Sequence, residues 1–146
     1  MNWKGILVAL LILAALGAGI AYYMWNKPHT DYENVEADYS LTANQLFDEL
    51  DAEETAKAKY QDKIVEINGE VEGIEQSADS AYIILLRADN ALMGGVNAKL
   101  ASSYNSSTAV SNLKEGEMLT LKCRFQGFEK DLITEVKCDN CFIVEK

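Results

Sequence analysis

The chain has 146 residues, and beyond an apolar start its length suits one domain with a modest core. All 23 acidic residues and 12 of the 13 basic ones follow residue 25, which gives that part of the chain a formal charge of −11. A surface of this sign repels phosphate backbones and anionic lipid headgroups, so the composition disfavours nucleic acid as a partner.

An uncharged run covers residues 6–25 and forms the first element of the chain. As a helix, this run reaches about 30 Å, which is the thickness of the hydrocarbon core of a bilayer. Trp3 precedes the run and Trp25 closes it, as aromatic residues do at the two interfaces of a spanning helix. We therefore expect residues 1–25 to be a transmembrane anchor that meets the membrane through residues 5–25. The short N-terminal tail favours a cytoplasmic N-terminus, with the following domain outside the cytoplasm.

A cleaved signal peptide is the alternative to an anchor. Ala15-Leu16-Gly17 resembles a small-residue cleavage site after a short apolar core. The apolar stretch continues to Trp25, beyond the length of a typical signal core, which favours the uncleaved anchor. Either kind of segment would export the domain.

A polar segment, residues 26–40, follows the apolar run. It contains Pro28, the only proline of the chain, and its composition predicts a juxtamembrane linker. The folded domain is then expected over residues 41–146.

Two short helices are expected at the start of this domain. Thr42 and Gln45 have the spacing of a capping box, which predicts a helix over residues 43–50. The apolar positions that this helix should bury are Leu46, Phe47 and Leu50. An acidic start signal at residues 51–54 predicts a second helix that ends near Tyr60.

Residues 64–73 alternate between apolar and polar side chains, which is the pattern of a half-buried strand, with Gly69 as a bend or bulge. Further strands are expected over residues 81–88, 94–100, 118–125 and 132–144, with a loop over residues 102–112. Five short strands with an irregular piece after the third predict a mainly β (α+β) fold. It is a five-stranded OB-type Greek-key barrel with short N-terminal helices, preceded by one transmembrane helix. Another small β-barrel or an α+β sandwich would show the same periodicity.

Several runs in the domain carry a family resemblance. They are Leu46-Phe47, the run Ala56-Lys57-Ala58-Lys59-Tyr60-Gln61-Asp62-Lys63, the run Val65-Glu66-Ile67-Asn68-Gly69-Glu70-Val71, and two later runs, Leu113-Lys114-Glu115-Gly116-Glu117 and Asp139-Asn140-Cys141-Phe142-Ile143-Val144. Over about residues 40–146 the chain resembles the bacterial OB-fold family called tRNA-anticodon-like. In that family a helical lead-in ends with "KY-x-x-K" and enters the first strand at "V-x-V-x-G-x-V".

The resemblance implies an exported or membrane-anchored bacterial protein without an assigned activity. Together with the N-terminal segment, it leads us to expect a single-pass protein of the bacterial inner membrane whose domain faces the periplasm or the outside. The family name reflects a distant likeness to nucleic-acid-binding barrels and does not establish RNA binding. A typical member has glycine at the position of Cys123 and a cysteine near Phe125, so the family gives no disulfide pairing for this chain.

The three cysteines are Cys123, Cys138 and Cys141, and export would let a disulfide persist. If the last two strands form a hairpin that turns at residues 130–131, Cys123 lies opposite Cys138, and we expect these two to be bonded. A turn one or two residues further on would instead bring Cys141 to Cys123. Three buried free thiols are the remaining possibility.

No residue pattern in the sequence predicts catalysis. Cys138 and Cys141 match Cys-x-x-Cys, but they fall within an expected strand and not at a helix start, where that motif acts in redox enzymes. The only histidine, His29, lies in the expected linker, and the sequence shows no nucleophile elbow, phosphate-binding glycine loop or metal-binding aspartate loop. We therefore expect no enzyme activity, no cofactor and no metal.

Binding is the function that these observations favour. Glu66, Glu70 and Glu72 form an acidic stripe that could meet a basic partner, and Tyr82 and Tyr104 could stack on a ligand. The first hypothesis is a non-enzymatic interaction module that contacts a protein or an envelope component. The alternatives are an oligonucleotide-binding barrel, by analogy of fold, and a thiol-active envelope protein.

Overall fold

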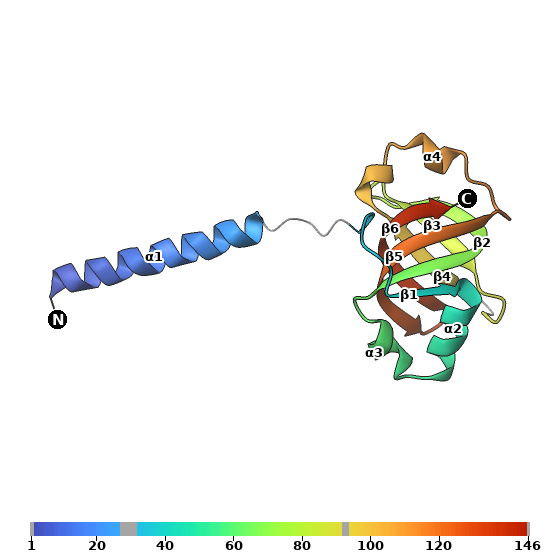
Figure 1. Ribbon diagram of the computed structural model, residues 1–146, viewed down its shortest axis with the longest axis horizontal. Coiled ribbons are helices and arrows are strands. Elements are labelled where there is room, and N and C mark those ends of the chain that lie inside the picture. Colours follow the sequence, from blue (N-terminus) through green and yellow to red (C-terminus); the bar gives the residue numbers. More distant parts are fainter. Residues whose placement is uncertain (1, 27–31, 92–93, 146) are drawn as a thin grey trace. The chain divides into compact units, whose positions relative to one another are not determined.

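The computed structural model describes residues 2–26, 32–91 and 94–145 (Figure 1). The chain forms two compact units, Met1–Thr30 and Asp31–Lys146, which are described separately below.

The first unit contains helix α1 (Trp3–Trp25), and no described side chain of this helix is buried. By length and composition α1 could cross a membrane, and it is the one such helix in the described part of the chain. The helix expected over the uncharged run is therefore present, and its place in a membrane stays a prediction.

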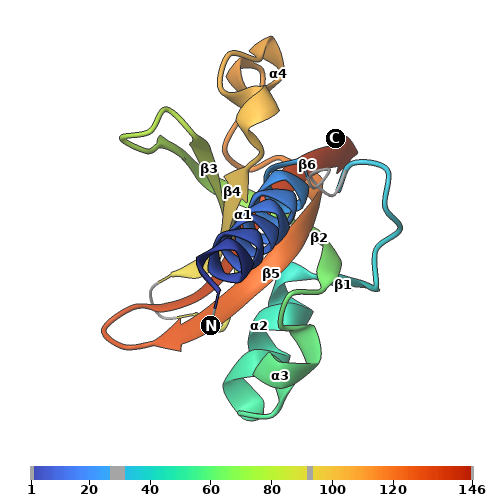
Figure 2. The ribbon, with the colours of Figure 1, turned by 90° about the vertical axis from the view of Figure 1, so that its left-hand side faces the viewer.

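The second unit contains β1 (Tyr39–Thr42), α2 (Ala43–Ala52), α3 (Ala56–Tyr60), β2 (Ile64–Gln76), β3 (Tyr82–Arg87), β4 (Gly95–Leu100), the 3₁₀ turn η1 (Ser102–Tyr104), α4 (Thr108–Ser111), β5 (Met118–Lys130) and β6 (Thr134–Glu145). Neighbouring strands follow the order β1-β2-β3-β4-β6-β5, and β5 also pairs with β2. Strands β2 to β6 thus close into the expected five-stranded barrel (Figure 1). Helices α2 and α3 lie together at one end of the barrel, and α4 lies at the other end, as Figure 2 also shows.

Strand β2 closes the barrel because it is long enough to serve two neighbours. Its first half pairs with β5 and its second half pairs with β3. The bulge expected at Gly69 is wrong, because the register shifts between Val71 and Gly73. Gly69 is instead a point of close approach, since a Cβ there would lie 3.0 Å from the Cβ of Ala43 at the start of α2.

The barrel interior holds the apolar positions that the alternating patterns predict. The inward residues are Val65, Ile67, Gly69 and Val71 of β2 and Leu119, Leu121, Cys123 and Phe125 of β5. The residues between them are half-buried on the outer surface. Helix α2 covers one end of this core with the three side chains expected for it, Leu46, Phe47 and Leu50.

The expected capping box begins α2. The Thr42 side chain accepts a hydrogen bond from the backbone of Gln45 at 3.2 Å, and the Gln45 side chain accepts one from the backbone of Thr42 at 3.0 Å. The second helix start expected at residues 51–54 is wrong, since α2 runs beyond its expected end and α3 begins at Ala56. Asp51 and Ala52 belong to the last turn of α2, and the extended backbone of Glu53 then ends the helix, with its N–H still donating to the carbonyl of Glu49.

The expected linker is not free along its described second half, because it packs on the barrel. We call residues 32–42, which comprise this part of the linker and β1, the strap. Its last part is β1, which pairs in parallel with the first half of β2. The N–H of Asp38 donates to the carbonyl of Ile64 at 2.8 Å, and the N–H of Ile64 donates to the Asp38 carboxylate at 3.0 Å. Further upstream, Lys122 donates to the carbonyl of Glu33. The strap therefore lies in the second compact unit, and the domain boundary expected at residue 41 stays a prediction. Four strand residues are too short a pattern to predict β1 from sequence.

A disulfide joins Cys123 of β5 to Cys141 of β6, and Cys138 is a buried free thiol. The structure therefore has the alternative pairing, and the pairing that we expected first, Cys123 with Cys138, is not the one it contains. The β5–β6 hairpin turns one to two residues further along than expected, which places Phe125 opposite Cys138. A register shift beside Cys123 then brings Cys141 into reach.

Candidate binding face

The outer surface of β3 and β4 is the candidate binding face, because OB-type barrels bind ligands on their second and third barrel strands. Alternation with buried inner residues directs four side chains outward: Ile83, Leu85, Asn97 and Lys99. Ile83 lies beside Lys99, and Leu85 lies beside Asn97. Ile83 and Leu85 are half-buried, so this surface, which we call the β3–β4 face, has an aliphatic centre.

Two cations of the β3–β4 face are already paired with carboxylates. Arg87 lies 3.2 Å from Glu70, and Lys99 lies 2.8 Å from Asp79 in the β2–β3 turn. Hydrogen bonds from Lys99 and then from Ser77 lower the pKa of Asp79 to about 2, so this carboxylate stays charged in all physiological conditions.

The neighbouring cation on β6 is paired as well. Lys137 lies 2.7 Å from Glu129 and 3.2 Å from Glu135, and hydrogen bonds from these two carboxylates raise the pKa of Lys137. Lys137 adjoins the face because it lies beside Asn97 in the parallel β4–β6 pair. The face thus carries local ion pairs and no open patch of one sign.

Neither tyrosine that the sequence suggested for stacking offers an open ring. Tyr82 follows the inward phase of β3, where it is half-buried and packs on the core. The hydroxyl of Tyr104 accepts a hydrogen bond from the backbone of Ile143 at 3.1 Å, and its ring packs edge-on against Phe142 with centroids 6.1 Å apart. Both residues therefore stabilise the barrel.

Sequence reasoning missed Ile83 and Leu85. Residues 81–88 are apolar at nearly every position, a pattern that indicates a central strand and does not single out these two side chains. In the structure one apolar row fills the core and the other lies on the outer surface. A strand that is apolar on both sides in a small, closed barrel is itself the signal for an aliphatic outer face, because no second layer covers it.

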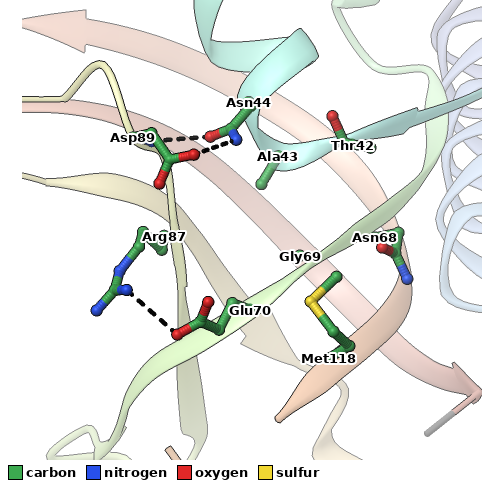
Figure 3. Close-up of a pocket in the computed structure, with 9 residues that line it drawn as sticks. All are labelled: Thr42, Ala43, Asn44, Asn68, Gly69, Glu70, Arg87, Asp89 and Met118. Atoms are coloured by element: carbon green, nitrogen blue, oxygen red, sulfur yellow. Dashed lines mark hydrogen bonds and ion pairs between the residues drawn. The ribbon is translucent and has the colours of Figure 1, made fainter. Parts of the chain in front are cut away.

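A cleft of about 270 Å³ lies at the end of the β3–β4 face, between the start of α2 and strands β2 and β3 (Figure 3). The Asn44 side chain both donates to the Asp89 carboxylate and accepts from the Asp89 backbone, each at 2.8 Å. Figure 3 shows that Arg87 reaches Glu70 on the opposite wall, away from this pair. These four polar residues of the cleft are thus paired with one another, and the cleft adds a concave surface at the end of the β3–β4 face.

The acidic stripe of β2 is divided among different roles. Glu66 accepts a hydrogen bond from Ser40 of the strap at 3.2 Å, and Glu70 pairs with Arg87. Glu72 is exposed. The stripe therefore does not act as one continuous acidic surface.

The thiol chemistry of the domain is confined to the disulfide and one buried group. Burial, with a smaller effect of the neighbouring Asp139 charge, raises the pKa of the Cys138 thiol far above its ordinary value. A protonated, buried thiol is a poor nucleophile, and its Cys-x-x-Cys partner, Cys141, is bonded elsewhere. Among the described residues there is no cluster of three or more possible metal ligands, and His29 lies outside the described residues.

The strand order and the closed barrel define an OB-fold domain. The chain belongs to the tRNA_anti-like family, whose sequence pattern matches residues 1–139. The resemblance seen in the sequence is thus confirmed. A comparison with curated proteins gives no match.

Two solved structures are among those similar to this chain. A candidate nucleic acid-binding lipoprotein from Klebsiella pneumoniae subsp. pneumoniae MGH 78578 is 17% identical with a TM-score of 0.56, over 81% of this chain and 99% of that chain. Asparaginyl-tRNA synthetase from Pyrococcus horikoshii is 14% identical with a TM-score of 0.44, over 63% of this chain and 22% of that chain. At its level of identity, the likeness to the Klebsiella protein shows the fold.

Proposed function

We propose that this protein is a single-pass protein of the bacterial inner membrane whose OB-fold domain, held outside the cytoplasm, binds another protein or an envelope component and catalyses no reaction. The length and composition of α1 support the anchor. The family match supports a binding domain. The Klebsiella protein of the same fold is itself described as a lipoprotein.

One observation carries the choice of a protein partner: each cation of the β3–β4 face has a carboxylate partner within 3.2 Å. A phosphate backbone binds by replacing the counterions of lysine and arginine, and here it would have to displace fixed carboxylates. An aliphatic centre with a rim of charged pairs is instead the arrangement of protein–protein interfaces. The half-buried Ile83 and Leu85 supply that centre.

Site-specific photo-crosslinking in living cells tests this proposal. A photoreactive amino acid in place of Leu85 should give one discrete cross-linked protein, and the same group in place of the exposed Thr108 on α4 should not. The photoreactive group in place of Ile83 should give the same cross-linked protein. In that variant a second change, Leu85→Lys, should abolish the cross-link. Cross-links to nucleic acid, or identical products from both positions, would overturn the proposal.

Nucleic-acid binding is the second candidate, and the description of the Klebsiella protein favours it. It predicts that the full-length protein in detergent binds a labelled single-stranded RNA or DNA at low salt, with an affinity that falls steeply as salt rises. The first proposal predicts no measurable binding under the same conditions, so the two outcomes exclude one another.

Protease added to intact spheroplasts tests the topology. The domain outside the cytoplasm should be digested without lysis, while a cytoplasmic control protein stays intact. A domain that is digested only after lysis would contradict the proposed orientation.

A further inference from the structure

A second surface lies along the last residues of β5, away from the β3–β4 face. Backbone pairing of β5 toward β2 ends at Phe125, whose N–H donates to the carbonyl of Lys63 at 2.9 Å and whose carbonyl accepts from Asp62 at 3.2 Å. Residues 126–130 continue to pair with β6 on their other side. Figure 2 shows the end of this hairpin projecting beyond the barrel.

Residues 126–130 therefore form an open strand edge about 16 Å long. No described backbone group bonds to this edge on the side away from β6. Two side chains occupy its carbonyls instead: Gln61 donates to Gln126 at 3.1 Å, and Lys57 donates to Phe128 at 3.4 Å. The second contact is long for a hydrogen bond, so the backbone N–H of an added strand could replace it.

A groove with an apolar floor runs beside the open edge. A cavity of about 350 Å³ lies between α2, α3 and β5 and has Leu50 and Phe128 in its wall. An adjoining cavity of about 420 Å³ reaches Phe47, whose ring meets the Phe128 ring edge-on at 6.0 Å. The two cavities share Asp51 and Lys130, and these residues form an ion pair of 2.6 Å across the groove.

The lining of this groove carries three carboxylates, of Asp51, Glu54 and Asp131, and two cations, Lys57 and Lys130. Glu54 borders the first cavity and Asp131 borders the second, and neither has a cation partner among the described residues. Among the described residues that line the groove, the cations are Lys57, which donates to the Phe128 carbonyl, and Lys130, which pairs with Asp51. After residue 25 the chain carries 23 acidic and 12 basic residues, so its long-range field also attracts a basic partner.

We propose that the open edge of β5 accepts an extended, basic segment of a partner protein as an added strand. Main-chain hydrogen bonds to residues 126–130 supply the pairing, as in other cases of strand addition. Apolar residues of the segment pack over Leu50 and Phe128, and alternate lysine or arginine residues meet Glu54 and Asp131. The proposal goes beyond the proposed function because it uses a surface separate from the β3–β4 face.

A synthetic peptide of alternating lysine and valine, long enough to cover the edge, is the probe for this proposal. It is titrated against the full-length protein in nanodiscs, and backbone hydrogen exchange is followed by mass spectrometry. Bound peptide should slow exchange in residues 126–130 and leave exchange in β3 and β4 unchanged. A second peptide, N-methylated on every backbone nitrogen, keeps the charge and the side chains but has no N–H to donate to the edge, and it should not protect these residues.

Two variants and a matched control complete the experiment. Lys57→Ala frees the Phe128 carbonyl and should tighten peptide binding severalfold. Glu54→Lys should weaken binding about tenfold, whereas the same charge change at the exposed Glu115, far from the groove, should alter it much less. Equal protection by the N-methylated peptide, or no protection by either peptide in the wild type and in Lys57→Ala, would overturn the proposal. Neither outcome bears on cross-links from Leu85, so the failure of this proposal is distinguishable from failure of the proposed function.

Discussion

Cys138 lies between two strands, beside Ala98 of β4 and opposite Phe125 of β5. It contributes as a small apolar side chain, because burial keeps its thiol protonated at neutral pH. The disulfide between Cys123 and Cys141 acts differently, since it constrains the unfolded chain across a separation of 18 residues.

Removal of the disulfide should therefore destabilise the domain, with Cys138 as the matched control. The double variant Cys123→Ala, Cys141→Ala should lose about 3 kcal/mol of unfolding free energy and become insensitive to reductant. Cys138→Ala should still lose stability when reductant is added. Urea denaturation with and without reductant measures both effects. A Cys138→Ala protein that no longer responds to reductant would show that Cys138 is a bonded partner in solution.

Glu49 joins α2 to α3 at the covered end of the barrel. Its carboxylate accepts hydrogen bonds from the Lys59 ammonium and the Tyr60 hydroxyl, both at 2.6 Å. These two hydrogen bonds, with that from Lys59 the larger, lower the pKa of Glu49 below its ordinary value of 4.5. The ammonium of Lys59 also lies 5.3 Å from the centroid of the Tyr39 ring, so the cluster extends to the strap.

The lowered pKa of Glu49 predicts a stability effect in acid. A carboxylate with a depressed pKa in the folded state stabilises the fold above its unfolded pKa, and this stabilisation is lost as pH falls through the folded value. Glu49→Gln should therefore melt below the wild type at pH 7, and the difference should shrink below about pH 4.5. Thermal melts across this range measure it, with the exposed Glu53→Gln as control. A difference that stays constant down to pH 3 would contradict the assignment.

At the scale of elements, α2 is fixed against the barrel by a glycine. A Cβ at Gly69 would meet the Cβ of Ala43 at 3.0 Å and the Cβ of Leu86 at 3.3 Å. The methyl of an alanine would therefore push α2 away from β2 and β3, where the cleft of Figure 3 lies.

Gly69→Ala should lower the unfolding free energy by about 1–3 kcal/mol, because extra volume in a packed site forces neighbouring groups apart. Gly127→Ala is the matched control, since a Cβ there has no neighbour within 4 Å. It should change the stability by less than about 0.5 kcal/mol. Equal urea midpoints for the two variants would show that α2 yields without cost.

Elements that depend on neighbouring residues in the sequence could be predicted. Features that depend on contacts between distant residues could not. The capping box of α2 follows from Thr42 and Gln45 alone, and the strands follow from alternation of side chains. The disulfide pairing depends on register shifts in the β5–β6 hairpin, which depend on the turn and on packing against β4. β1 forms because β2 offers it a free edge, so its four residues alone could not predict a strand.

In the candidate site, too, the residue pattern was visible in the sequence, while the contacts that give it its form were not. The apolar pattern of β3 contained Ile83 and Leu85, but their exposure depends on closure of the barrel, which leaves their side of the sheet without a second layer. The ion pairs of the face depend on contacts such as that of Lys99 with Asp79, 20 residues apart, and no local pattern records them.

At the scale of the whole molecule, the proposal of a protein partner over nucleic acid rests on charge pairing. The acidic excess repels a phosphate backbone at long range, and the ion pairs of the β3–β4 face neutralise its cations at short range. Release of these cations should therefore create a measurable affinity for single strands.

The triple variant Asp79→Asn, Glu129→Gln, Glu135→Gln frees Lys99 and Lys137. We expect it to bind single-stranded RNA with a slope of about −1.4 in a plot of log affinity against log salt, for two phosphate contacts. A variant that neutralises three other exposed carboxylates, Asp62, Glu72 and Glu115, has the same net charge and should bind less. Anisotropy titrations at several salt concentrations measure both. Equal affinities would show that net charge alone controls binding.

The strap has a consequence for the maturation of the protein. Because folding already incorporates the chain from residue 32, any processing event within the apolar segment or just after it removes nothing that the barrel uses. An anchored and a released form would then share one folded domain and the same two surfaces. A cut only ten residues later would strip the edge of β2 and leave it open to pairing between molecules, which is a route to aggregation.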